Sequence, residues 1–131
     1  MTTFQLATPS RECVVDVTRR AAEAVAAAGV AEGLCSVFVP HTTAAVTINE
    51  NADPDVQQDL LKFLAELVPR SWPYLHREGN SDAHIKASLL GSSVQVPVSG
   101  GRLALGTWQG VFLVELDGPR TRNLQIVVQG R

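Results

Sequence analysis

Aromatic and sulfur-containing side chains are scarce in this chain of 131 residues. Phe, Trp and Tyr together make up 5% of it, and there are two cysteines. With so few aromatic residues, the core has to be built from Val, Leu, Ile and Ala. Cys13 and Cys35 form no Cys-x-x-Cys motif, which excludes a zinc ribbon and a thioredoxin-type redox site. We expect both thiols to be reduced.

Long apolar runs and a dominant charge are also missing. No uncharged apolar stretch approaches the ~20 residues that a membrane span requires. The net charge is −2, and no basic stripe or patch of the kind that binds nucleic acid is visible. Residues 1–7 contain neither a basic nor a long apolar segment, so we expect no secretory signal and a cytoplasmic location. We therefore expect neither a membrane nor a nucleic acid as partner.

What remains is the composition of one globular domain. Hydrophobic residues make up 45% of the chain and charged residues 18%, which excludes intrinsic disorder. A chain of this length is typical of a single domain that buries about two thirds of its unfolded surface. No linker or internal repeat interrupts it, so we predict one domain over residues 1–131.

Hydrophobic spacing predicts two main helices and a shorter third one. Apolar residues recur at helical intervals over 17–28, and Gly29 is expected to end that helix. Asp53 and Pro54 mark the start of the clearest amphipathic helix, over 53–67. The short helix runs from 82 or 83 to 90, before Gly91.

Alternating or continuous apolar segments predict the strands, over 3–8, 34–39, 41–49, 93–98, 103–105, 109–116 and 124–128. In the 41–49 strand, the period of two places Ala44 and Val46 on the core side and His41 and Thr43 on the other. Strands and helices do not alternate regularly, which argues against a doubly wound parallel sheet. The order predicts an α+β fold with helices against a mostly antiparallel sheet.

All three histidines, His41, His76 and His84, lie in polar segments. Three neutral imidazoles suit Zn²⁺ or a similar divalent cation and leave a fourth position for water or substrate. Their spacing matches no standard zinc motif. The alternative is three separate histidines that are exposed or hydrogen-bonded.

Four further residues have both a chemical and a structural interpretation. Glu50, next to Asn49, is a candidate general base or a partner for a histidine, but both residues also suit a turn before a helix. Lys86 is a candidate phosphate ligand or desolvated amine, although a solvated lysine on an exposed helix face is the favoured interpretation. Trp108 suits stacking on a ligand as well as filling a core or an interface.

Arg120, in Asp-Gly-Pro-Arg, either binds an anion or is only an exposed residue of a hairpin loop. The standard nucleotide-binding, hydrolase and zinc-protease motifs are absent. The Gly-rich segment 99–106 opens no helix, so it is a weak candidate for a phosphate cradle.

Four ordered motifs resemble the YjbQ-like family over nearly the whole chain. They are His-Thr-Thr-Ala at 41–44, Asn-Glu-Asn-Ala-Asp-Pro at 49–54, the segment 78–91 around Ser-Asp-Ala-His-Ile-Lys, and Leu-Gly-Thr-Trp-Gln-Gly at 105–110. The resemblance implies a small α+β protein with a mixed sheet in a sandwich-like or barrel-like unit, assembled as a homotrimer. It also implies a secondary thiamine-phosphate synthase activity, which joins a thiazole phosphate to a pyrimidine diphosphate and releases diphosphate.

The resulting hypothesis is a small enzyme-like protein with a His-rich pocket. The family's histidines fall on His41, His76 and His84, which favours a divalent metal, with zinc as the candidate. The remaining site residues are Asn49, Glu50 and Lys86 in catalytic roles and Thr43, Trp108, Gln109 and Arg120 as ligands of the substrate or its phosphate groups.

Two alternatives stay open. One is a non-catalytic homotrimeric module that binds a small phosphorylated metabolite, and the other is a structural trimer whose polar clusters join subunits. Because the chain is short, we expect the site at or near a subunit boundary.

Overall fold

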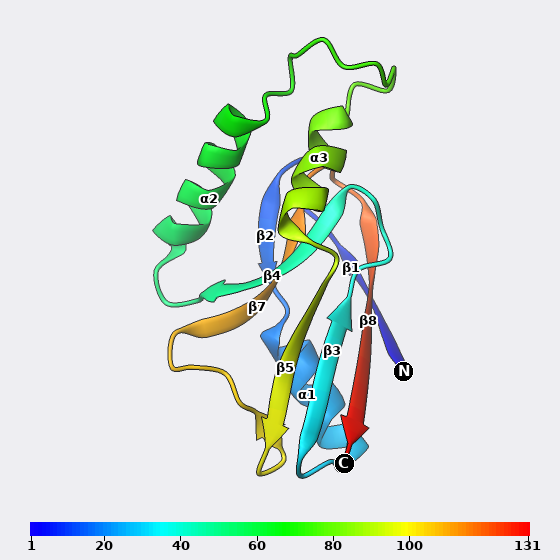
Figure 1. Ribbon diagram of the computed structural model, residues 1–131, viewed down its shortest axis with the longest axis vertical. Coiled ribbons are helices and arrows are strands. Elements are labelled where there is room, and N and C mark those ends of the chain that lie inside the picture. Colours follow the sequence, from blue (N-terminus) through cyan, green and yellow to red (C-terminus); the bar gives the residue numbers. More distant parts are fainter.

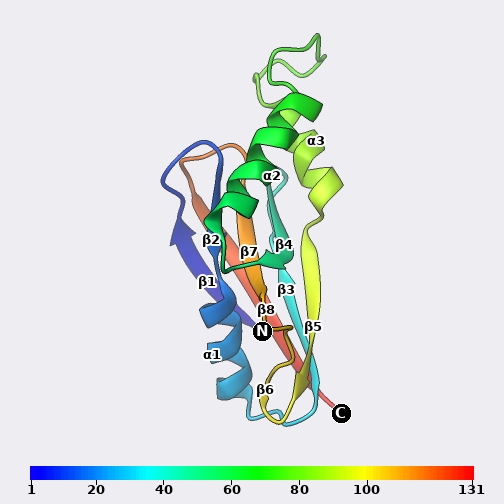
Figure 2. The same cartoon turned by 90° about the vertical axis from the view of Figure 1, so that its left-hand side faces the viewer.

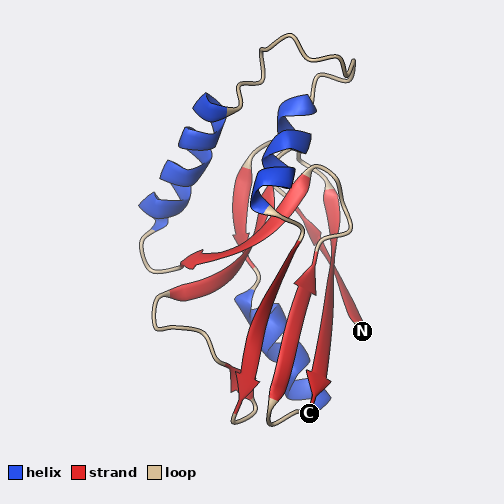
Figure 3. Ribbon diagram, viewed as in Figure 1, coloured by secondary structure: helices blue, strands red, loops and turns tan.

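The computed structural model describes all 131 residues. The strands are β1 (Thr2–Ala7), β2 (Cys13–Asp16), β3 (Gly33–Phe38), β4 (Ala44–Glu50), β5 (Ser93–Ser99), β6 (Arg102–Leu103), β7 (Gln109–Glu115) and β8 (Thr121–Gly130). The helices are α1 (Thr18–Ala28), α2 (Pro54–Leu67) and α3 (Ser81–Leu90). Figures 1 and 3 show α2 and α3 near one end of the molecule and α1 near the other. The predicted α+β class and all three helices are confirmed.

Five strands form the larger sheet, in the order β1-β8-β3-β5-β6. The long strand β8 pairs on both sides, with β1 and with β3. Alternate side chains of β8, those of Arg122, Leu124 and Ile126, are buried, as the two-residue period of a strand requires. Arg122 is therefore a charged residue at a core position.

Three strands form the smaller sheet, in the order β2-β7-β4. All residues of β7 from Gly110 to Glu115 are buried, because both faces of this strand are covered. Leu113 belongs to the main core, whereas Val114 packs in a smaller cluster with Ala45 and with Ala83 of α3. The nearly continuous apolar sequence of β7 is the pattern expected for burial on two sides.

The main core joins residues of both sheets with α1. It contains fifteen buried residues, to which α1 contributes Ala21, Ala24 and Val25. Gly29 ends α1 in the left-handed conformation, with φ of 63°, as predicted. Phe112 is the one buried aromatic residue, so the core consists mainly of small and aliphatic side chains, as the composition indicated.

Helix α2 begins as predicted but is only partly covered by its own chain. Asp53 Oδ1 accepts a hydrogen bond from the Asp55 N–H at 2.9 Å, and Pro54 follows the cap. Leu64 is the only buried residue of α2, whereas Phe63 is 64% and Leu67 57% exposed. In Figures 1 and 2, α2 lies on the outside of the molecule and a long loop connects it to α3. The amphipathic pattern identified the helix, and Leu61 packs against the smaller apolar cluster, but the part of the apolar face with Phe63 and Leu67 stays exposed.

Several expectations need correction. Residues 13–16 form β2, which was not predicted, because this short segment owes its strand conformation to pairing with β7, far away in sequence. Residues 41–43 precede β4, which begins at Ala44. The expected mixed sheet is wrong, since every strand pair is antiparallel.

Both cysteines are free, and Cys35 is buried. No helix has the length and apolar character to cross a membrane.

Candidate functional site

A polar cavity of about 350 Å³ opens where segments far apart in the sequence meet. These segments are the β3–β4 loop, the start of α3, and the β7–β8 loop with the first residues of β8. The cavity is lined by Pro40 and nine polar or charged residues: His41, Thr42, Thr43, Glu78, Asn80, His84, Asp117, Arg120 and Arg122. Four predicted site residues, His41, Thr43, His84 and Arg120, are thus brought together.

A buried ion pair forms one side of the cavity. The guanidinium of Arg122 donates to both carboxylate oxygens of Glu115 and, at 2.9 Å, to Thr43 Oγ1. Thr8 Oγ1 donates to Glu115 Oε1 at 2.7 Å. Burial alone would raise the pKa of Glu115, but the hydrogen bonds from Arg122 and Thr8 outweigh it and lower that pKa. The charge of Arg122 is therefore balanced inside the protein.

Arg120 is the cation that the cavity leaves accessible. Its Nε donates to the Asp117 carbonyl at 2.8 Å and its terminal NH₂ to Asp117 Oδ2 at 2.9 Å. Asn80 Nδ2 donates to the same carboxylate oxygen at 2.8 Å. Burial acts to raise the pKa of Asp117, but these hydrogen bonds and the charge of Arg120 lower it overall. The Arg120 side chain is 52% exposed, and three of its five N–H donors remain free.

His41 is held in one orientation by β8. Its Nε2 accepts a hydrogen bond from the Asn123 backbone N–H at 2.8 Å, which requires a neutral ring with its proton on Nδ1. Burial, assisted by the charges of Arg122 and Arg120, lowers the pKa of His41 below its ordinary 6.5, and Glu115 opposes this shift. At neutral pH, His41 is therefore an N–H donor through Nδ1.

The lowered pKa of His41 predicts a pH dependence of stability. The unfolded chain binds the histidine proton more tightly than the folded protein, so the contribution of His41 is fully present above pH 6.5. That contribution falls as the pH drops through the folded-state pKa, because protonation also removes the bond from Asn123. Denaturant unfolding at a series of pH values should show this loss in the parent protein. His41→Gln keeps an acceptor but does not titrate, so it should flatten the curve below pH 6.5. An unchanged curve would contradict the assignment.

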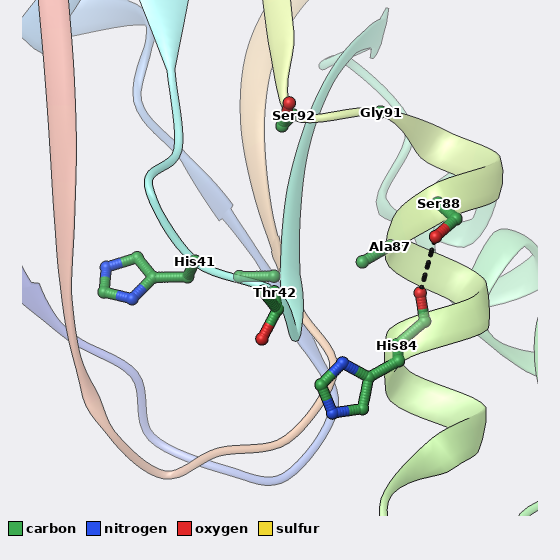
Figure 4. A pocket seen from close by; sticks show the side chains of 8 residues that line it. His41, Thr42, His84, Ala87, Ser88, Gly91 and Ser92 are labelled. Atoms are coloured by element: carbon green, nitrogen blue, oxygen red, sulfur yellow. Dashed lines mark hydrogen bonds between the residues drawn. The ribbon is translucent and has the colours of Figure 1, made fainter.

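His84 of α3 borders three cavities. Besides the polar cavity, it lines a neighbouring one of about 350 Å³ together with Thr42, Ser88 and Ser92. Figure 4 shows the His84 ring extending from α3 beside Thr42, whereas His41 extends the other way, toward β8. The two imidazoles therefore border the same space without facing each other.

The three histidines do not form a metal centre within this chain. The rings of His76 and His84 meet edge to face with their centroids 5.3 Å apart, and Nε2 of His41 is occupied by Asn123. No group of three His, Cys, Asp or Glu side chains could hold a metal ion. One chain thus does not assemble the predicted ligand set.

Lys86 is buried, and its favoured interpretation as a solvated lysine is wrong. It is 1% exposed, and its Nζ donates to Glu12 Oε2 at 2.8 Å and to Asp82 Oδ2 at 3.1 Å. Asp82 also pairs with Arg11 at 3.1 Å. Burial would raise the pKa of Asp82, but the hydrogen bonds from Lys86 and Arg11 lower it. This ionic cluster ties α3 to the segment between β1 and β2, and the amine does not reach the polar cavity.

The other predicted site residues lie together at the far end of the smaller sheet: Asn49, Glu50, Trp108 and Gln109. Glu50 pairs with Gln109 at one end of β4, and Ala44 pairs with Glu115 at the other. Six residues of strand separate the two ends by about 20 Å. Within one chain, these residues do not line the cavity that holds the histidines and Arg120.

Comparisons with known proteins identify the family. The model of the family described as UPF0047 protein YjbQ-like matches residues 2–131. The chain belongs to the YjbQ/UPF0047 family. UPF0047 protein MJ1081 of Methanocaldococcus jannaschii is 47% identical over 127 residues, which cover 97% of this chain and 92% of that protein. UPF0047 protein YugU of Bacillus subtilis is 45% identical over 131 residues, which cover 98% of each. The resemblance found in the sequence is confirmed.

Solved structures of similar proteins have the same fold. The crystal structure of an uncharacterized conserved protein of the YjbQ/UPF0047 family from Clostridium acetobutylicum has a TM-score of 0.97 and 47% identity, and the match covers 98% of this chain and all of that one (100%). Hypothetical protein APE1520 from Aeropyrum pernix K1 has a TM-score of 0.94 and 41% identity, with 99% and 98% covered. The names of these YjbQ/UPF0047 relatives state no activity, so the function has to be argued from the site.

Sequence reasoning missed several residues that shape this site in the YjbQ/UPF0047 chain. Glu115, Arg122 and Asp82 are buried and paired, and Asn80 orients Asp117. A signal was present for Glu115, because this charged residue directly follows the apolar run 111–114 in a predicted strand. A charge at a core position has to find a partner.

Proposed function

We propose that this YjbQ/UPF0047 protein binds a small phosphorylated metabolite in the polar cavity. The observation that carries the proposal is the half-exposed guanidinium of Arg120, which lines the cavity and keeps three free N–H donors. A planar guanidinium recognises phosphate through parallel, charge-assisted hydrogen bonds. The imidazoles of His41 and His84 border the same cavity and supply further hydrogen-bonding groups.

The carboxylates of the cavity do not oppose an anion strongly. Asp117 is already engaged by Arg120 and Asn80. The Glu78 side chain is 74% exposed and lies 3.7 Å from His76 Nε2, so solvent screens its charge. These contacts support the polar cavity as a phosphate site.

The reaction that we propose for this site is the transfer implied by the family resemblance. A ring nitrogen of the thiazole phosphate forms a bond to the methylene carbon of the pyrimidine diphosphate, and the bond from that carbon to the diphosphate oxygen breaks. The departing diphosphate takes the electron pair and needs cationic donors. Arg120 supplies a fixed charge there, which stabilises the leaving group.

Binding of inorganic phosphate tests the proposal. Arg120→Gln should weaken it roughly 10- to 100-fold, because a hydrogen bond to a charged group contributes about 1.5–3 kcal/mol. Titration followed by ¹H–¹⁵N NMR measures this. Arg19→Gln is the matched control, since Arg19 is 91% exposed and pairs with Glu23 on α1. Equal affinities of the Arg120 and Arg19 variants would refute Arg120 as the phosphate ligand.

Turnover separates an enzyme from a binding module. Thiamine phosphate formed from the two substrates, and lost in Arg120→Gln, would support the transferase. Phosphate binding and a raised melting temperature without any product would instead favour the non-catalytic alternative.

We also propose that the protein is a homotrimer that works in the cytoplasm. The exposed apolar residues of α2, Phe63 and Leu67, support self-association, and the two free cysteines suit a reducing compartment. Sedimentation measures the oligomeric state.

The predicted zinc or other divalent ion is tested separately, by measuring the metal content of the parent protein and of the His→Ala variants.

A further inference from the structure

A second surface, with aromatic and apolar character, lies beside the polar cavity. It is formed by the segment between α2 and α3 together with α3 itself, and it borders an open cavity of about 440 Å³. We call Trp72, Tyr74, His76 and Ile85 the aromatic shelf. Trp72 is 60% exposed, although an indole is among the side chains that gain most from burial. The shelf therefore has the composition of a site for a flat, apolar group.

Contacts within the segment hold the shelf in place. The Tyr74 hydroxyl donates to the Pro69 carbonyl at 2.5 Å, and the Tyr74 N–H donates to the Trp72 carbonyl at 2.7 Å. The rings of Trp72 and Tyr74 lie 5.2 Å apart with an interplanar angle of 44°. The aromatic groups are thus positioned before any ligand arrives, which lowers the entropy lost on binding.

His84 joins the shelf to the polar cavity. It lines both cavities, and its ring lies 5.3 Å from that of His76, centroid to centroid. His84 is thus the side chain that the two cavities share, with Arg120 lining one of them and Trp72 the other. The polar cavity suits an anion, and the aromatic shelf suits a planar ring.

We propose that the aromatic shelf holds the planar ring of the same ligand whose phosphate group enters the polar cavity, and that Trp72 determines specificity for ring-bearing phosphates. This inference rests on the proposed phosphate site and adds a ring subsite to it. Stacking on a fixed indole should favour phenyl phosphate over methyl phosphate by roughly three- to tenfold. Residues 72–85 thus select what the phosphate is attached to.

The test uses the full-length Trp108→Phe protein, in which Trp72 provides the only indole N–H signal. ¹H–¹⁵N NMR titration with phenyl phosphate should shift that signal, whereas methyl phosphate should bind without shifting it. Trp72→Leu should reduce the affinity for phenyl phosphate to that for methyl phosphate and leave the latter unchanged. Trp108→Leu is the matched control, because Trp108 is similarly exposed, at 63%, but lies at the far end of the smaller sheet.

Each other result overturns the inference. Equal binding of both phosphates, with Arg120→Gln still reducing it, would leave the phosphate site intact and remove the ring subsite. If neither phosphate binds, the proposed function fails and the ring subsite fails with it. If Trp72→Leu instead reduces the sedimentation coefficient while the preference for phenyl phosphate persists, the shelf is a contact between copies of the chain. Melting curves of both leucine variants should match the parent curve, since each replaces an exposed side chain.

Discussion

Replacing Glu115 by alanine is expected to lower the free energy of unfolding by about 3–5 kcal/mol. Glu115 is fully buried and accepts hydrogen bonds from Arg122, Thr8 and two backbone N–H groups. Its removal would leave the Arg122 guanidinium buried without a counter-charge. Since domains of this size are stable by about 5–15 kcal/mol in total, the variant should unfold at a much lower urea concentration. Circular dichroism during urea unfolding measures the change.

Two further variants show whether the unpaired charge is the cause. Arg122→Met in the Glu115→Ala background removes the stranded guanidinium and should recover part of the lost stability. Glu23→Ala breaks the exposed pair with Arg19 on α1 and should cost less than about 0.5 kcal/mol. A loss for Glu115→Ala as small as that for Glu23→Ala would contradict a structural role of the buried pair.

The second large effect is expected from Gly118→Ala. A Cβ at this position would lie 2.4 Å from the Ser10 carbonyl oxygen, 2.8 Å from Glu115 Cγ and 2.9 Å from Thr8 Oγ1. The nearest of these atoms belongs to the backbone, so the β7–β8 loop would have to move away from the β1–β2 segment. We expect a loss of about 3 kcal/mol, at the upper end for overpacking. Phosphate binding should weaken as well, because the same loop carries Arg120.

Gly130→Ala is the control for this substitution. Its Cβ would meet Val30 side-chain atoms at 3.3 Å and 3.4 Å, and a side chain at a strand end can shift by that amount. We expect a change below about 1 kcal/mol and normal phosphate binding. The two alanine variants should therefore differ both in their thermal unfolding and in their affinity for phosphate. Equal behaviour would mean that the close approach at Gly118 is not required.

Local signals in the sequence predicted much of the fold. The Asp53–Pro54 start of α2, the Gly29 end of α1 and the apolar character of β7 each follow from short segments. The same reasoning failed for β2, since a four-residue strand depends on a partner about a hundred residues away. It also failed for Lys86, because one of its two counter-charges, Glu12, lies 74 residues earlier. Burial of a charged residue becomes predictable only when its distant partner is known.

The candidate site was predicted in part for the same reason. His41, His84 and Arg120 stood out as rare or charged residues in polar segments, and they do meet. Asn49 and Glu50 belong to an equally prominent motif but lie at the other end of β4. Residue type indicates which side chains carry chemistry. The strand register decides which of them share a cavity, and the register became known only with the structure.

Helices α2 and α3, which flank the aromatic shelf, are held to the rest of the protein with different strength. Lys86 and Asp82 fasten α3, and with it His84, through ion pairs to Glu12 and Arg11. Helix α2 buries only Leu64, so its local unfolding should cost far less than that of the core. The segment that carries Trp72 connects these two helices. The polar cavity therefore belongs to the more stable part of the fold, and local unfolding of α2 would release the aromatic shelf before it disturbs His84 and Arg120.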